Sequence, residues 1–98
     1  MAVAEADIAF ALDLLSDLGD LTSRKMFGGM CLYQEGVVFA LLSIDGTLYL
    51  KAKGDVATEL AASGEQFHNM PYWSFPMSAL DDPQEACTLA RRTLATLN

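Results

Sequence analysis

The apolar positions near the start of the chain predict an amphipathic helix over residues 4–18. They recur at the i, i+3, i+4, i+7 spacing that makes one stripe along a helix. The stripe consists of Ile8, Ala11, Leu12, Leu15 and Leu18. Gly19 follows the last turn, where a glycine commonly ends a helix. Asp13, Asp17 and Asp20 lie on the opposite side, either as a solvated face or as a docking stripe for a basic partner.

Three apolar segments joined by short turns predict an antiparallel meander. The strands are expected over Gly29–Gln34, Val37–Ser43 and Thr47–Ala52. The connections are Glu35-Gly36 and Asp45-Gly46, and Asp-Gly between apolar runs is the strongest short hairpin signal in this chain.

The middle strand is apolar on both of its faces. Side chains alternate along a regular strand, which gives two sets that face opposite ways. The sets are Val37, Phe39 and Leu41, and Val38, Ala40 and Leu42. If helices cover one face of the sheet, the second face needs another cover. That cover is either a second copy in a homodimer or aromatic side chains of the same chain.

The second half of the chain predicts a short helix, two short strands and a final helix. The short helix is expected over Val56–Ser63, with Asp55 as its N-cap and Gly64 at its end. Strands over Gln66–Asn69 and Tyr72–Phe75 are bounded by prolines, which places them at a sheet edge.

The last helix has a clear start, and its apolar face continues to Leu97. Asp82 suits the N-cap, Pro83 the first helical position and Glu85 the capping-box position. The element order is therefore α-β-β-β-α-β-β-α, an α+β fold in a single domain over residues 1–98, with a sheet of about five strands.

Composition narrows the function classes. The chain has 98 residues, 52% apolar and 19% charged, which excludes a disordered chain. The net charge of -7 argues against tight nonspecific binding to nucleic acid, where Lys and Arg dominate affinity. The longest apolar run is Val37–Leu42, far below the roughly 18 residues of a membrane span. Glu5 and Asp7 do not suit a secretory signal, so we expect a cytoplasmic protein without membrane contact.

The catalytic inventory is small. His68 is the single histidine, and no spacing supports a dyad with Cys31 or Cys87. These two cysteines form no CxxC pair, so Cys and His alone cannot assemble a four-ligand zinc site. One disulfide is arithmetically possible, but two small buried hydrophobes are the favoured interpretation. We expect no enzyme, no catalytic residue, no metal and no cofactor.

Basic and aromatic residues are the candidates for an interaction surface. They are Arg24, Lys25, Tyr49, Lys51, Tyr72 and Trp73. Arg24 and Lys25 precede the meander and Lys51 ends it, so a small basic patch beside Tyr49 is one interpretation. The other is that these charges protect an edge strand from aggregation. Tyr72 and Trp73 indicate a protein contact if they are exposed, and core packing if they are not.

The most specific signal is the string Arg24-Lys25-Met26-Phe27-Gly28-Gly29. A strand, a turn at Gly36, a strand with Phe39 and the sequence LYLK at residues 48–51 follow it. The later parts of the pattern are Gly64 with Phe67, Tyr72-Trp73 ahead of Pro76, and LDDP at residues 80–83. From about Ile8 to Leu97 the chain resembles the N-terminal domain of TfoX/Sxy-type competence regulators.

The resemblance implies a two-layer α/β domain with an antiparallel sheet, similar to the secretion-chaperone-like arrangement. It implies a bacterial cytoplasmic protein linked to the regulation of natural transformation genes, which acts with a cyclic-AMP-responsive activator. Met26, Phe27, Gly28 and Gly29 would then be structural motif residues.

Three functions follow from these features. The first is a non-enzymatic interaction module that acts on transcription through protein contacts. A homodimer is compatible with this function. The second is a small anionic-ligand-binding domain or enzyme with a pocket near Arg24, Lys51 and Tyr49. The third is direct DNA binding through the basic patch, which the acidic charge balance disfavours.

Overall fold

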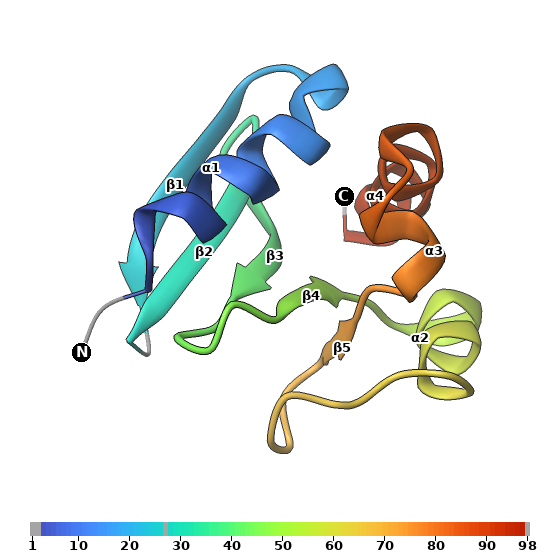
Figure 1. The fold of residues 1–98 in the computed structure, drawn as a ribbon. Helices are drawn as coiled ribbons and strands as arrows, with labels where there is room; N and C mark the ends of the chain where they lie inside the picture. The colour runs from blue at the N-terminus through green and yellow to red at the C-terminus, as the bar shows by residue number, and fades with distance from the viewer. Residues whose placement is uncertain (1–2, 27, 98) are drawn as a thin grey trace.

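The protein forms a five-stranded antiparallel sheet with helices packed on one face, which confirms the expected α+β fold (Figure 1). The computed structural model describes residues 3–26 and 28–97. The strands are β1 (Leu21–Met26), β2 (Gly29–Gln34), β3 (Val37–Leu42), β4 (Leu48–Lys51) and β5 (Tyr72–Ser74). The helices are α1 (Glu5–Leu14), α2 (Gly54–Ala61), α3 (Met77–Leu80) and α4 (Pro83–Leu97), with a 3-10 turn η1 (Ser16–Leu18). The sheet order is β1-β2-β3-β4-β5.

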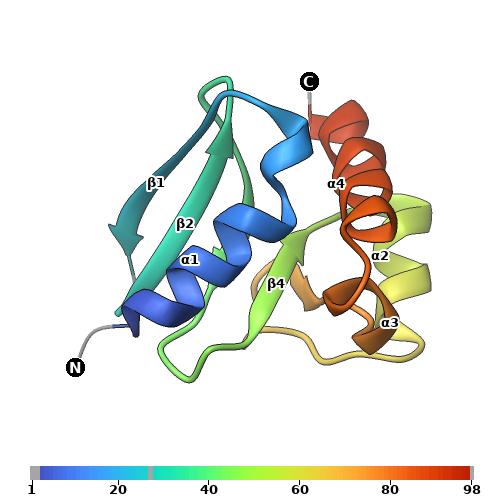
Figure 2. The ribbon, with the colours of Figure 1, turned by 45° about the horizontal axis from the view of Figure 1, so that its top comes forward.

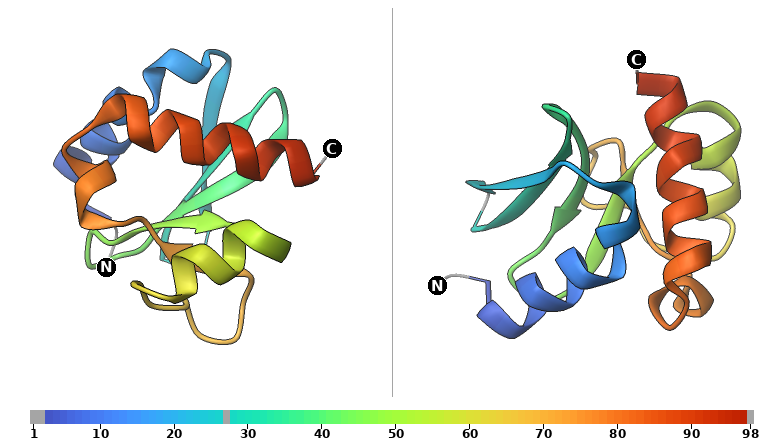
Figure 3. Two further views of the ribbon diagram at one scale, coloured as in Figure 1. Left: turned by 90° about the vertical axis from the view of Figure 1, so that its right-hand side faces the viewer. Right: turned by 90° about the horizontal axis from the view of Figure 1, so that it is seen from above.

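The long helix α4 lies between α1 and α2, and the main core lies beneath these helices (Figures 2 and 3). Each helix contributes apolar side chains to this core, because its stripe of apolar positions faces the sheet. Leu15, Leu60 and Ala90, from the α1 end, α2 and α4, are at most 1% exposed. On the sheet, Leu32 and Leu50 from β2 and β4 meet them and are fully buried.

A bulge in β3 changes which way its side chains face. The pairing of β2 with β3 shifts between Leu32 and Tyr33, so that Leu32 pairs with Ala40 and Tyr33 with Val38. Phe39 is the extra residue, and it joins Ala40 in the main core. The strict alternation expected for this strand is therefore wrong, because a bulge places two residues of one strand opposite one residue of its neighbour. Leu41 faces the second side of the sheet, away from Phe39.

The second side of the sheet carries a smaller core that the chain covers itself. Its buried members are Cys31, Leu41, Tyr49 and Tyr72. Phe67 and Met70, from the loop before β5, pack against them. The Phe67 and Tyr49 rings meet edge to face at 5.1 Å, a favoured aromatic geometry. Aromatic side chains of the same chain therefore cover the second face of the sheet, and the burial of β3 on both faces does not require a homodimer partner.

The sheet differs in one strand from the sequence prediction. β1 was not expected, whereas residues 66–69 form only an isolated bridge from Gln66 to Trp73. In β1 Leu21 is half-buried and every other residue is exposed, so this strand has no apolar alternation to reveal it. The five-stranded count and the approximate element order are nevertheless as expected.

The helix ends agree in part with the predicted signals. Oδ1 of Asp82 accepts hydrogen bonds from the backbone N–H groups of Gln84 at 3.1 Å and Glu85 at 3.4 Å, which confirms this N-cap. The Glu85 carboxylate does not close a capping box, because it accepts a bond from the Ser78 hydroxyl at 2.7 Å.

Two predicted helix boundaries are wrong. Helix α1 stops at Leu14, and the 3-10 turn η1 carries the chain on to Gly19. Helix α2 is preceded by Lys53 as its N-cap residue, and Asp55 lies inside the first turn, where a carboxylate favours the positive end of the helix dipole.

Leu41→Ala tests whether the second core belongs to a single chain. Leu41 is fully buried, so the substitution should lower the free energy of unfolding by about 2–5 kcal/mol in urea denaturation. Ile44→Ala is the control, since Ile44 is 44% exposed and its loss should cost no more than about 0.5 kcal/mol. The wild-type midpoint should not change over an about tenfold range of protein concentration; a midpoint that rises would mean that association with a second copy adds to the stability of the fold.

Candidate functional site

Strand β1 is an open edge of the sheet and is exposed on both of its faces (Figure 1). Its inner side pairs with β2, from Leu21 opposite Gln34 to Met26 opposite Gly29. Beyond that pairing, the Glu35 backbone N–H donates to the Asp20 carbonyl oxygen at 3.2 Å. Antiparallel ladders alternate between bonded and non-bonded pairs. Because residue 20 belongs to a bonded pair, the backbone N–H and C=O groups of residues 21, 23 and 25 point outward.

The opposite edge of the sheet, β5, is covered by the chain. The Ser74 backbone N–H donates to the Glu65 carbonyl oxygen at 2.9 Å, and the Phe67 N–H donates to Tyr72 at 2.8 Å. Residues 65–67 therefore occupy the outer side of β5. Within the described ranges 3–26 and 28–97, β1 is the long edge left open to another strand.

The β1–β2 hairpin differs in charge from the rest of the chain. Residues 21–34 contain Arg24 and Lys25 and no Asp or Glu. Because the whole chain carries -7 and this hairpin +2, the remainder carries -9. The positions of Arg24 and Lys25 agree with the interpretation that they are edge-strand charges.

The structure does not bring Arg24, Lys51 and Tyr49 into one pocket. Register places Arg24 opposite Cys31, Cys31 opposite Leu41, and Leu41 opposite Tyr49. Arg24 and Tyr49 therefore lie in one cross-strand row, three strand spacings or roughly 14 Å apart. The side chains between them, Cys31 and Leu41, are buried at 1% and 0% exposure, so no common hollow joins the ends of this row.

Tyr72 and Trp73 lie mainly inside the protein. They face opposite sides of β5, as expected for neighbours in a strand. Tyr72 is 6% exposed in the second core, and Trp73 is half-buried against the main core. Their burial fits the core-packing alternative, so we do not include them in the candidate surface.

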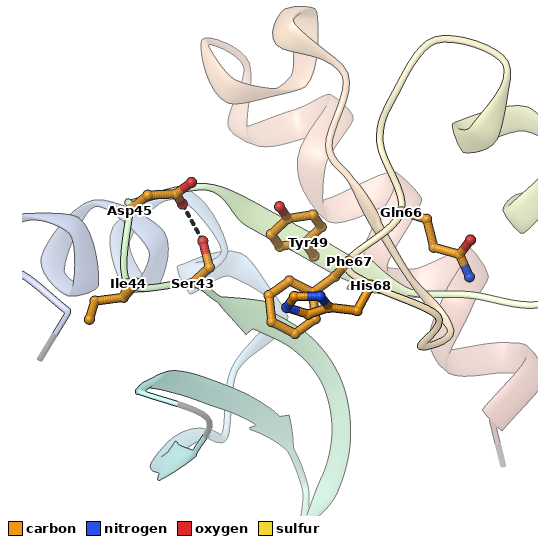
Figure 4. Close-up of a pocket in the computed structure, with 7 residues that line it drawn as sticks. All are labelled: Ser43, Ile44, Asp45, Tyr49, Gln66, Phe67 and His68. Carbon is orange, nitrogen blue, oxygen red and sulfur yellow. Dashed lines mark hydrogen bonds between the residues drawn. The ribbon is translucent and has the colours of Figure 1, made fainter. Parts of the chain in front are cut away.

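A hollow of about 410 Å³ lies between the β3–β4 turn and the loop before β5 (Figure 4). Its lining residues are Ser43, Ile44, Asp45, Tyr49, Gln66, Phe67 and His68. The Phe67 ring meets Tyr49 at 5.1 Å and His68 at 4.5 Å, both edge to face. His68 has a φ of 52°, a left-handed conformation that non-glycine residues seldom adopt. Asp45, Tyr49, Phe67 and His68 had each been named from the sequence, but nothing there grouped them, because the loop and the turn meet only in the fold.

The polar groups of the hollow do not form a nucleophile–base pair. The Ser43 hydroxyl donates to the Asp45 carboxylate, and the Thr47 backbone N–H donates to the same oxygen at 3.0 Å. These two bonds hold the pKa of Asp45 below its ordinary value. Ser43 and Asp45 thus complete the turn between β3 and β4, and a carboxylate kept ionised there is a poor general base.

Negative charge surrounds the Tyr49 hydroxyl. Burial is the main cause that raises the pKa of Tyr49, and the carboxylates of Asp45 and Glu65 raise it further. An anion placed beside Tyr49 would meet the same repulsion. The electrostatics of this hollow therefore oppose the binding of an anionic ligand. The separation of Arg24 from Tyr49 opposes it as well.

Both cysteines are free and buried, as the sequence indicated. Cys31 lies in the second core and Cys87 in the main core. Burial raises the pKa of both thiols, with a smaller opposing effect of Lys51 on Cys31 and of Arg91 on Cys87. A thiol with a raised pKa is a weak nucleophile at neutral pH.

The motif residues have structural roles where the structure describes them. Met26 accepts a weak bond from the Cys31 thiol, with 3.6 Å between the sulfurs. Gly28 has a φ of 78°, which favours glycine. A Cβ on Gly29 would overlap the backbone carbonyl oxygen of Leu42, so this position needs a glycine for close approach. Phe27 lies outside the described residues.

Within 3–26 and 28–97, no group of three or more His, Cys, Asp or Glu side chains could hold a metal ion. In the same part of the chain, no helix has both the length and the apolar character to cross a bilayer.

The fold and its motif define a small α+β domain with one basic, open sheet edge. A family model described as the TfoX N-terminal domain matches residues 13–97, and the chain belongs to that family. No curated protein matches the chain.

Gly29→Ala tests the structural role of the motif. The added methyl group must displace the β3 backbone, so we expect a loss of about 1–3 kcal/mol in the free energy of unfolding. Thr22→Ala, on exposed β1, is the control and should change it by no more than about 0.5 kcal/mol. A Gly29→Ala protein as stable as the wild type would show that this close approach does not constrain the motif.

Ser43→Ala tests the electrostatics of the hollow. Removal of its hydroxyl should raise the pKa of Asp45, measured from the carboxyl carbon shift during an acid titration. The lowered pKa means that Asp45 stabilises the fold above its ordinary pKa, about 3.9, and that this contribution is lost as the pH falls through the folded-state pKa. Ser78→Ala is the control, because that hydroxyl bonds Glu85. An unchanged pKa of Asp45 in Ser43→Ala would exclude the bond as its cause.

Proposed function

We propose that this domain is a non-enzymatic, regulatory protein-interaction module that receives an extended segment of a partner protein at the open edge of β1. The observation that carries the proposal is the unpaired outer side of a six-residue strand whose two faces are both exposed. An open edge offers backbone donors and acceptors in a row, which is the surface that strand addition uses.

Strand addition fits the arrangement of β1 better than a side-chain pocket does. The outward backbone groups of residues 21, 23 and 25 supply up to three donor–acceptor pairs. The side chains next to these backbone groups are short or flexible. Residues 22–26 are exposed, so no side chain from another element covers this part of the strand. A partner strand could therefore lie against the edge without rearrangement of the core.

The family supports a regulatory setting for this contact. The chain resembles regulators of competence genes, and those regulators act with a cyclic-AMP-responsive transcription activator. We propose a transcription activator as the partner and the bacterial cytoplasm as the location. The net charge of -7 supports an effect on transcription through a protein rather than through direct DNA contact. A homodimer was the other expectation from the sequence; because the chain covers its second core itself, we expect none, and the concentration series of the Leu41 experiment tests this.

The alternative function, an anionic-ligand site or enzyme at Arg24, Lys51 and Tyr49, has less support. Two intervening strands separate Arg24 from Tyr49, and the carboxylates of Asp45 and Glu65 raise the pKa of Tyr49. No observation on the described residues favours a chemical reaction at this position.

Ser23→Pro tests strand addition at β1. Proline removes an N–H group that points away from β2, so it should block an added strand while the inner ladder is preserved. We expect purified cyclic-AMP-responsive activator to shift the amide resonances of β1 in the wild-type domain, and these shifts to be lost in Ser23→Pro.

The matched control for this experiment is Ser23→Ala, which keeps the backbone N–H and should bind as the wild type does. Amide spectra of β3 and β4 show whether each variant is folded. Shifts confined to the acidic side of α1, or equal shifts in the proline variant, would contradict strand addition at this edge.

A further inference from the structure

We infer that the segment received at the β1 edge is acidic, with adjacent carboxylates opposite Arg24 and Lys25. This inference rests on the proposed function, because it names the chemistry of the occupant of the same edge. It is carried by two cations that the fold leaves without carboxylate partners on a strand that is otherwise uncharged.

Arg24 and Lys25, the cations of β1, form no ion pair with a carboxylate of the described residues. Across residues 3–26 and 28–97, the ion pair present joins Arg92 to Glu59 at 2.7 Å, between α4 and α2. Arg24 and Lys25 are exposed, and no Asp or Glu occurs in the hairpin that holds them. Their charges therefore face solvent and the position of an added strand.

Register places these two charges on opposite faces of the sheet. Arg24 pairs with Cys31, a member of the second core, and Lys25 pairs with Met30, a member of the main core. Directly opposed residues of paired strands project from the same face, with Cβ atoms about 4.5–5.5 Å apart. Two consecutive acidic residues on one added strand would therefore meet both cations, one on each face.

A second copy of this chain fits the edge less well than an acidic segment. Pairing β1 with itself would gather four cations on two adjacent strands, and like charges near one another destabilise such pairs. It would also bring together two bodies that each carry -7. An acidic strand instead meets two exposed cations in a hairpin that contains no Asp or Glu.

Three hexapeptides that differ only at their centre test the inference. They are Val-Thr-Glu-Glu-Thr-Val, its Gln-Gln counterpart and its Lys-Lys counterpart, each blocked at both ends. Titration of the isotope-labelled domain at millimolar peptide should shift the β1 amides. We expect the Glu-Glu peptide to bind about threefold to tenfold more tightly than the Gln-Gln peptide, because exposed ion pairs contribute modestly. The difference should shrink at high salt.

A double substitution tests whether Arg24 and Lys25 cause the preference for the Glu-Glu peptide. In Arg24→Gln with Lys25→Gln, the Glu-Glu and Gln-Gln peptides should bind equally well. Lys53→Gln, which removes an exposed cation outside β1, should keep the preference.

The outcomes separate this inference from the proposed function. Equal binding of all three peptides at β1, or tightest binding of the Lys-Lys peptide, would overturn the acidic occupant and leave strand addition intact. No β1 shift with any peptide would overturn both. Shifts of β1 that grow with protein concentration in the absence of peptide would identify a second copy as the occupant and overturn the inference.

Discussion

The double-sided burial of β3 is the constraint on which the rest of the structure depends. One strand must supply side chains to the main core under the helices and to the second core under the loop before β5. The bulge at Phe39 makes this possible, because it places Phe39 and Ala40 together in the main core and turns Leu41 to the other side. Without a covering loop, Leu41 and Tyr49 would lie on an exposed sheet face.

That covering loop also determines which sheet edge is open. To bring Phe67 and Met70 over the second core, the chain must run beside β5, and its backbone there bonds the outer side of that strand. The edge at β5 is thus closed by the same segment that completes the core. No comparable segment among residues 3–26 and 28–97 covers β1, so the packing that stabilises one side of the sheet leaves the far edge available.

The parts of the fold that follow from burial could be predicted from the sequence, and the parts that face solvent could not. Helices α1, α2 and α4 and strands β2 to β4 were found from their apolar segments, helix-end residues and turns, whereas the four-residue helix α3 was not predicted. β1 was missed because Thr22 to Met26 are all exposed, so neither face selects apolar residues. The hollow was missed for another reason: Asp45 and His68 belong to segments that approach each other only through the tertiary fold. Arg24 and Tyr49, by contrast, were grouped from the sequence, and strand order separates them.

The sign of the charge at β1 carries more information than its presence. Any charge on an edge strand hinders aggregation, and lysine is a frequent one there, so the presence of Arg24 and Lys25 agrees with protection of the edge. An acidic edge would match the surrounding surface and repel copies of the chain as well as acidic partners. Arg24 and Lys25 instead carry the sign opposite to the net charge of the chain, and under the proposed function this sign would attract an acidic strand. A positive edge on a negative body would favour acidic strands over basic ones, which is how charge can give specificity to an edge whose backbone would pair with any strand.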